Sequence, residues 1–343
     1  MTSPEAGSVT APVLVMTLGG TIAMAPAAEG GLSIALDAGE LLSDLEDELV
    51  APVEVEKVSA QPSSQLTLEE VIALAGRITH RIADRRYAGV VVTQGTDTME
   101  ESAFALDLLL ESPTPVVVTG AMRSPARPGS DAPANLAAAV ATAASSAARG
   151  LGTLVVMNDE IHAARFVKKL HTASPAAFAS APGPLGWVSE GRPRIALRPS
   201  ARMRVPIPDV GWSGSVPLIA VGLGDDGAAL GEVLRRPPDG LVVAGLGAGH
   251  VPRRLVSPLA ELASKIPVVL ASRTGSGEVP RNVYDFPGSE RDLLVRGLIS
   301  GQWLDPWKCR ILLELLLRGP GNCTAAAFTS VVEGALADPT VTK

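Results

Sequence analysis

Aromatic residues are scarce in this chain, which disfavours an antiparallel β-sandwich. Only 3% of its 343 residues are aromatic, whereas 46% are hydrophobic, and alanine, valine and leucine carry most of that fraction. Such a mix suits helices packed on buried parallel strands. Because the chain is also too long for one small core, we expect an α/β protein of two domains.

Blocks of lysine or arginine are missing, and cysteine is nearly absent. The formal net charge is −7 at pH 7, so the chain lacks the basic surface expected of a nucleic-acid-binding protein. We therefore expect a small molecule as the partner and no nucleic acid. Cys309 and Cys323 are the only thiols, which implies no disulfide framework. Cys309 falls in an apolar helical pattern, where a buried cysteine acts as a small hydrophobic residue.

Long apolar runs and metal-binding patterns are absent as well. No apolar segment reaches about 18 residues, and residues 1–8 show no basic region followed by an apolar run. This predicts a cytoplasmic protein with no membrane partner. The histidines have neither paired spacing nor cysteine neighbours, so we expect no metal and no other cofactor. They are His80, His162, His171 and His250.

Short β-branched runs alternate with helical patterns, which is typical of parallel sheets flanked by helices. The runs expected to form buried strands are Val13–Met16, Gly89–Thr93, Pro115–Thr119, Thr153–Met157, Pro217–Val221, Gly240–Ala244 and Pro267–Ala271. A stretch rich in Arg, Pro, Ser and Gly after the fourth run indicates a linker. We expect a larger N-terminal domain with a mostly parallel sheet over residues 1–190, a linker over 191–216, and a smaller parallel α/β domain over 217–343.

Ligands of open parallel sheets bind beyond the carboxyl ends of the strands, so the loops that follow the strands carry the chemistry. After the first strand, Gly19 and Gly20 let the backbone approach a ligand and direct N–H groups at a developing oxyanion beside the Thr21 hydroxyl. This arrangement fits a nucleophile and a substrate-binding glycine. The alternative is a tight turn with a capping hydroxyl.

The loop after the second strand repeats this arrangement. Gly95 precedes Thr96 and Asp97, so Thr96 could orient a water molecule or act as a nucleophile, while Asp97 could bind an α-ammonium group. The alternative is that Thr98 caps a helix together with Glu101. Two such threonine loops in consecutive strand-to-helix turns favour a functional site.

With these loops, the chain resembles the L-asparaginase family of two-domain bacterial enzymes from about residue 11 to about residue 335. The resemblance implies that Thr21 attacks the side-chain amide of L-asparagine, forming an acyl-enzyme and ammonia, and that water releases aspartate; glutamine could be a lesser substrate. The matching segments are Thr17–Ala23, Thr93–Glu101, Val118–Arg123, Asp131–Asn135, Val156–Asp159, Gly183–Gly186 and Ser272–Gly275.

The resemblance also implies a second cluster made of Thr96, Asp97 and a lysine. Spacing from the Val156–Asp159 segment puts the family lysine at Lys169 rather than at its neighbour Lys168. Lys169 would lower the cost of deprotonating Thr96 or its water. The alternative is a solvent-exposed lysine on a helix.

Recognition of the two ends of the amino acid follows from the same resemblance. Ser64 and Gln65 are expected to bind the substrate α-carboxylate while Asp97 binds the α-ammonium group. Ser63 is the alternative to Ser64, and an ordinary loop before a helix cap at Thr67 is a further one.

Assembly is a third implication. The resemblance predicts a homotetramer, a dimer of dimers, whose active sites are completed across the subunit interface. Within one site, the backbone carbonyl of Ala121 would accept the amide nitrogen. His250 aligns near a position that contributes to a neighbour's site, and a helix-cap or loop histidine is the alternative.

The chain departs from the family in its activating tyrosine. Many members carry one in the loop after the first threonine, but residues 24–36 contain none, and Tyr87 and Tyr284 are the only tyrosines. We hypothesise that Tyr284 from a partner subunit replaces it; the alternative is a packing or rim aromatic. Gln94 and Leu18 also differ from the family pattern, and we expect these differences to alter packing or substrate preference.

Other classes of function fit the sequence less well. Gly245, Gly247 and Gly249 faintly resemble a dinucleotide fingerprint, but the third glycine is one residue early. A non-hydrolytic protein that binds asparagine or aspartate is a stronger alternative, because the loop tyrosine is missing. An ammonia-supplying amidotransferase component should show an added domain or a basic surface, and this chain has neither.

Overall fold

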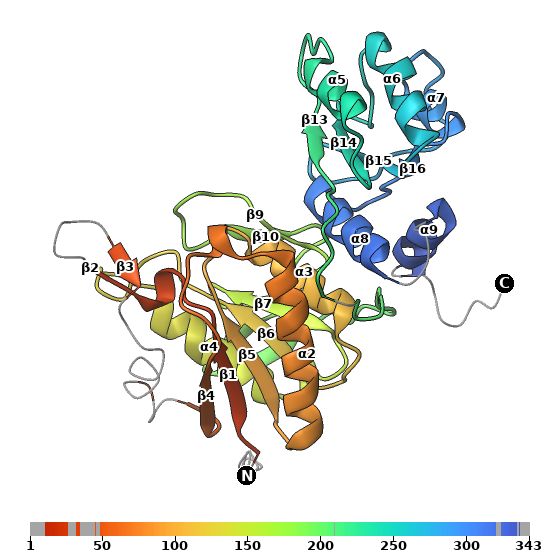
Figure 1. The fold of residues 1–343 in the computed structure, drawn as a ribbon. Coiled ribbons are helices and arrows are strands. Elements are labelled where there is room, and N and C mark those ends of the chain that lie inside the picture. Colours follow the sequence, from red (N-terminus) through yellow and green to blue (C-terminus); the bar gives the residue numbers. More distant parts are fainter. Residues whose placement is uncertain are drawn as a thin grey trace. The chain divides into compact units, whose positions relative to one another are not determined.

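The computed structural model divides the chain into two compact units, Met1–Pro199 and Ser200–Lys343 (Figure 1). It describes residues 11–26, 32–34, 45, 49–208, 210–319, 324–334 and 336. Cys323 and residues 1–8 lie outside the described residues, as does most of the segment 24–36.

The N-terminal unit is built on an eight-stranded sheet, counted over the described residues, with strand order β12-β11-β8-β7-β6-β5-β1-β4. Strands β4, β1, β5, β6 and β7 run parallel, and β8, β11 and β12 add antiparallel pairs at one edge. The strands are β1 (Val13–Thr17), β4 (Val53–Lys57), β5 (Gly89–Thr93), β6 (Val116–Thr119), β7 (Thr153–Met157), β8 (Glu160–Ala163), β11 (Gly186–Ser189) and β12 (Arg192–Ile195).

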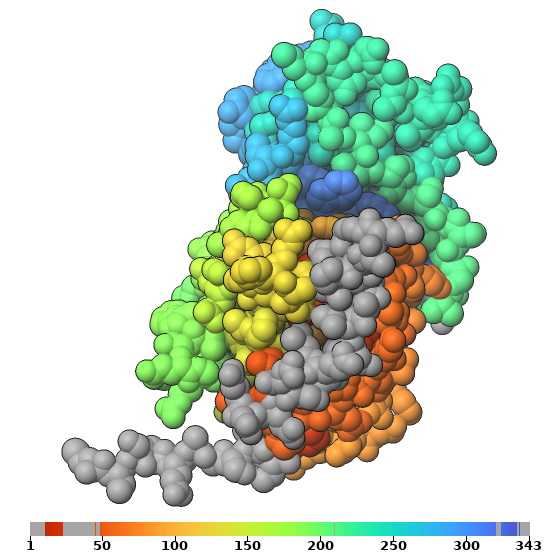
Figure 2. All heavy atoms as spheres, turned by 90° about the vertical axis from the view of Figure 1, so that its left-hand side faces the viewer, coloured from red at the N-terminus to blue at the C-terminus, as the bar shows by residue number. Residues whose placement is uncertain are grey.

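Helices cover both faces of this sheet, because its central strands are buried valine-rich runs with no solvent-facing side (Figure 1). The helix α4 (Ala132–Ala144) packs on the face that carries Val91 and Val117, and α2 (Leu68–Asp84) packs with α3 (Met99–Leu109). In Figure 2 the green β11–β12 edge and the orange α2 surface lie on opposite sides of this unit.

Smaller elements surround the carboxyl ends of the strands. Two hairpins form sheets of their own: β2 (Met24–Pro26) with β3 (Leu32–Ile34), and β9 (Val167–Lys169) with β10 (Phe178–Ser180). Short 3₁₀ turns are η1 (Thr21–Ala23) and η3 (Ser63–Gln65) at this end, and η4 (Ser146–Ala148) at the amino ends of the strands, between α4 and β7.

The C-terminal unit contains a parallel sheet of order β13-β14-β15-β16. Leucine and valine of these strands form its core together with α6. The strands are β13 (Leu218–Ala220), β14 (Leu241–Gly245), β15 (Val268–Ser272) and β16 (Ile299–Ser300). The helices are α5 (Ala228–Arg235), α6 (Arg253–Ala263), α7 (Glu290–Val295), α8 (Pro306–Arg318) and α9 (Ala325–Gly334).

The expected fold class is confirmed: a larger, mostly parallel α/β unit precedes a smaller parallel one. Residues 192–195, which we expected in the linker, form β12, because their backbone pairs with β11 despite the polar side chains. In the described parts of the chain, every helix is too short or too polar to cross a membrane.

Candidate active site

The two threonine loops follow β1 and β5, which are neighbouring parallel strands whose carboxyl ends lie side by side. In the pairing of β1 with β5, Thr17 lies opposite Thr93, and the Leu18 N–H donates to the Thr93 carbonyl at 2.9 Å. Residues 18–21 and 94–98 therefore start side by side at the carboxyl end of the sheet.

The two loops touch through glycine backbones. Gly20 has φ +89°, and a Cβ placed on it would lie 2.1 Å from the backbone nitrogen of Gly95. Only glycine tolerates both the left-handed conformation and this approach. Each glycine directly precedes one of the two threonines, so the contact brings the half-buried Thr21 and the buried Thr96 to neighbouring positions.

Lys169 joins the second threonine loop. Its Nζ donates to Thr96 Oγ1 at 2.8 Å and to Asp97 Oδ1 at 2.8 Å. The Lys169 side chain is 16% exposed, whereas the Asp97 side chain is 68% exposed. The Asp97 carboxylate therefore contacts the largely buried Lys169 ammonium group on one side and solvent on the other. Lys169 lies in β9, so the alternative of a surface helix lysine is wrong.

Ser63 determines the shape of this loop from a distant segment. Its buried Oγ accepts the Asp97 N–H at 3.2 Å, and its carbonyl accepts the Thr98 hydroxyl at 3.0 Å. Thr98 is the N-cap residue of α3, but the expected bond from its side chain to the helix is absent, because the hydroxyl donates to Ser63 instead. Ser64 and Gln65, the expected carboxylate ligands, follow in η3 with exposed side chains.

The helix cap expected at Thr67 is present. Thr67 and Glu70 form a capping box at the start of α2, in which the Glu70 N–H donates to Thr67 Oγ1 and the Thr67 N–H donates to Glu70. Gln61 donates to the same Glu70 carboxylate at 2.9 Å. Hydrogen bonds from the backbone N–H of Thr67 and from Gln61 lower the pKa of Glu70, although burial opposes them. The cap thus anchors the segment that contains η3.

The Ala121 peptide is oriented by the helix that follows. The Asp131 carboxylate accepts the Met122 N–H at 2.9 Å and the Arg123 N–H at 2.8 Å. Since the described residues contain no cis peptide, the Ala121 carbonyl points away from Asp131. Asn135 adds a bond to the Gly120 carbonyl at 3.0 Å. From the sequence, residues Asp131–Asn135 match the family pattern, but no role could be predicted for them.

Gln94 is integrated into the core of the second loop. Its side chain is 1% exposed, its Oε1 accepts the Ser102 hydroxyl at 2.8 Å, and its Nε2 donates to the Gly95 carbonyl at 3.2 Å. It therefore links the loop to α3. Leu18 is also buried.

His250 and Tyr284 belong to the C-terminal unit and contact each other there. Their rings meet edge to face with centroids 4.7 Å apart. The buried Glu290 carboxylate lies 3.2 Å from His250 Nε2 and accepts the N–H groups of Val283 and Tyr284, both at 2.9 Å. Burial would raise the pKa of Glu290, but these hydrogen bonds together lower it. Tyr284 is 43% exposed, and His250 is a loop histidine between β14 and α6.

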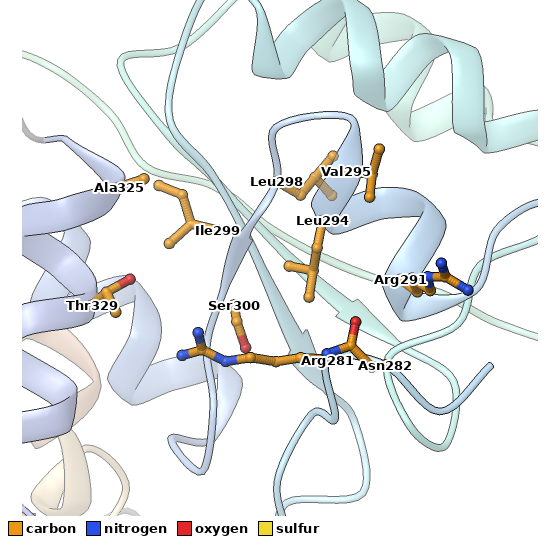
Figure 3. Close-up of a pocket in the computed structure, with 10 residues that line it drawn as sticks. All are labelled: Arg281, Asn282, Arg291, Leu294, Val295, Leu298, Ile299, Ser300, Ala325 and Thr329. Carbon is orange, nitrogen blue, oxygen red and sulfur yellow. The ribbon is translucent and has the colours of Figure 1, made fainter. Parts of the chain in front are cut away.

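A pocket of about 400 Å³ lies in the same unit beside α7, β16 and α9 (Figure 3). Its two cations already have carboxylate partners, since Arg281 pairs with Glu333 and Arg291 with Asp285. The remaining lining is largely aliphatic, so the pocket offers no constellation for proton transfer or nucleophilic attack. The described residues also include no cluster of three or more potential metal ligands.

Comparisons with known proteins find matches to both units of the chain. A family model described as "Asparaginase, N-terminal" matches residues 12–201, and one described as "Glutaminase/Asparaginase C-terminal domain" matches residues 215–327. The second match includes the glycine-rich segment that faintly resembled a dinucleotide fingerprint.

Individual relatives match over most of their length. The L-asparaginase of Bacillus licheniformis is 33% identical over 315 residues, covering 89% of this chain and 95% of that protein. The glutaminase-asparaginase of Pseudomonas fluorescens biotype A is 32% identical over 89% of this chain and 86% of that protein. A crystal structure of a probable cytoplasmic L-asparaginase from Campylobacter jejuni has a TM-score of 0.82 and 30% identity, covering 94% of this chain and 99% of that one. The chain therefore belongs to the asparaginase family.

Proposed function

We propose that this enzyme hydrolyses the side-chain amide of L-asparagine to L-aspartate and ammonia. The observation that carries the proposal is the contact of Lys169 Nζ with both Thr96 and Asp97 at 2.8 Å, next to a loop that holds Thr21. The relatives named L-asparaginase support the substrate, because they match over nearly their whole length.

In the first step, Thr21 Oγ bonds to the side-chain amide carbon. The C–N bond breaks, the hydroxyl proton is transferred to the leaving nitrogen, and ammonia departs from an aspartyl ester of Thr21. Backbone N–H groups beside Gly20 and Gly95 would stabilise the oxyanion, since these glycines allow close approach of a ligand. The Ala121 carbonyl, which is turned away from Asp131, would accept the substrate amide N–H.

In the second step, water attacks the same carbon, the ester bond breaks, and the proton returns to Thr21. Thr96 would orient the water, and the positive charge of Lys169 favours its deprotonation. Asp97 is exposed on one side, which suits a carboxylate that must bind the α-ammonium group of a free amino acid. Ser64 and Gln65 would bind the α-carboxylate.

Activation of Thr21 is assigned to a second copy of the chain. Residues 24–36 contain no tyrosine, and Tyr284 is half exposed with its backbone held by Glu290. We propose that Tyr284 reaches the neighbouring subunit's site in a homotetramer and that His250 borders that site. The cytoplasmic location stays a prediction.

Ammonia release from the purified chain tests the proposal, with L-asparagine, L-glutamine and D-asparagine as substrates. We expect L-asparagine to be hydrolysed fastest. Thr21→Ala and Thr96→Val should both lose this activity, whereas Thr79→Val, which removes an exposed hydroxyl on α2, should keep it. Full activity of Thr21→Ala would exclude this residue as the nucleophile.

The absent loop tyrosine favours one second candidate, a regulatory protein that binds asparagine or aspartate without hydrolysing it. Calorimetry separates the two. Tight binding of asparagine with no ammonia from any of the three substrates would support the regulatory protein.

A further inference from the structure

Lys169 is bound at two points, and only one of them involves its ammonium group. Its backbone N–H donates to Glu100 Oε2, while its Nζ donates to Thr96 and Asp97. Glu100 lies in the first turn of α3, directly after the loop that contains Thr96 and Asp97. The segment 96–100 therefore binds both the ammonium group and the backbone N–H of Lys169.

The backbone bond is needed because of where β9 lies. The hairpin of β9 and β10 is a two-stranded sheet, separate from the eight-stranded one. The Leu170 N–H donates to the Ala177 carbonyl across the hairpin, and successive residues of a strand alternate in direction. The Lys169 N–H therefore points to the open edge of the hairpin, where Glu100 accepts it.

A general electrostatic role explains Glu100 less well. Acidic residues in a first turn stabilise the helix dipole, and Glu101 beside it can do the same from a half-buried position. Glu100 is only 8% exposed. A buried carboxylate is costly unless it accepts hydrogen bonds, and the backbone N–H of Lys169 donates one to Glu100.

We propose that Glu100 is a positioning residue that fixes β9 so that the Lys169 ammonium stays on Thr96 and Asp97. This inference rests on the proposed function, because it concerns the lysine assigned to the deacylation step. Glu100 binds the backbone of Lys169 and has no assigned contact with substrate. Its effect on turnover therefore passes through Lys169.

Two substitutions of Glu100 distinguish the effect of side-chain length from the effect of its negative charge. Glu100→Gln keeps the length of the side chain and an oxygen acceptor, whereas Glu100→Asp keeps the charge but is one methylene too short. With L-asparagine, we expect Glu100→Asp to lower kcat by about 10- to 100-fold with a smaller change in KM, since small misplacements of a catalytic group cost this much. Glu100→Gln should recover most of the wild-type kcat. The matched control is Glu101→Asp, which shortens a neighbouring acid of the same turn and should leave kcat unchanged.

A double mutant shows whether the effect passes through Lys169. In a Lys169→Ala background, Glu100→Asp should lower kcat no further. If Glu100→Asp instead impaired folding in general, it would lower kcat in this background as well. Equal midpoints of thermal unfolding for all variants would support a positioning role of Glu100. If Lys169→Ala lowers kcat but Glu100→Asp does not, this inference is wrong and the proposed function stands. If Lys169→Ala keeps full activity, the proposed role of Lys169 fails, and the inference fails with it.

Discussion

The buried histidine of β8 predicts how the stability of the protein depends on pH. The His162 side chain is fully buried, and burial lowers its pKa from 6.5 to about 4. Glu160 lies 3.3 Å from its Nε2, but this carboxylate is 46% exposed, so solvent weakens its attraction for a proton. His162 Nδ1 lies 3.0 Å from Ser180 Oγ in β10, which connects the β9–β10 hairpin to the main sheet.

The direction follows from the two pKa values. Well above pH 6.5 the imidazole of His162 is neutral in the folded and unfolded states and adds no pH dependence. As the pH falls towards 4, the unfolded state takes up the proton first, so the free energy of unfolding decreases. One pKa unit is worth about 1.4 kcal/mol, so the full loss is about 3 kcal/mol.

Urea denaturation of wild type and His162→Gln at about pH 8 and about pH 5 measures this loss. We expect the wild type to lose about 2 kcal/mol more than the variant between these conditions, because most of the titration window has then been crossed. His80→Gln is the control, since the His80 side chain is 73% exposed. Parallel pH profiles for the wild type and His162→Gln would refute the reasoning.

Three further predictions concern the candidate site. Gly20→Ala should abolish ammonia release and lower stability by at least about 1–2 kcal/mol, because alanine must adopt a left-handed backbone against the neighbouring loop; an active, stable variant would contradict the contact. Asp131→Ala should raise KM for L-asparagine more than it lowers kcat, since the peptide of Ala121 loses its orientation; an unchanged KM in steady-state kinetics would argue against this role. Tyr284→Phe should reduce asparagine turnover while size-exclusion chromatography shows an unchanged oligomer, and full turnover would rule out the phenol as the activating group.

The buried parallel strands could be predicted from sequence because each is a short apolar run between turn residues. The observed strand β6 begins at Val116 rather than at the expected Pro115, and the others agree within one or two residues. The edge strands were missed for a physical reason. In the edge strand β12 and in its neighbour β11, exposed side chains such as Arg192 and Trp187 interrupt the apolar run and obscure the pattern.

Some parts of the candidate site could also be predicted from the sequence, and others could not. The threonine loops could be found because their residues are adjacent in sequence and follow buried strands. Contacts between distant segments left no local signal: Glu100 has the sequence pattern of a helix-dipole acid, and Ser63 that of a loop residue. Thr98 illustrates the limit, since its sequence fits a helix cap and only the tertiary approach of Ser63 redirects its hydroxyl.

The backbone contact between Gly20 and Gly95 also bears on protein engineering. Two glycines packed against each other leave no side chain whose size or polarity can be varied, so directed evolution has no usable substitutions at this point. A loop transplanted from another asparaginase would have to arrive together with its neighbour. The proposed carboxylate ligands Ser64 and Gln65 are more accessible to redesign, because their side chains are exposed and their replacement leaves the glycine contact intact.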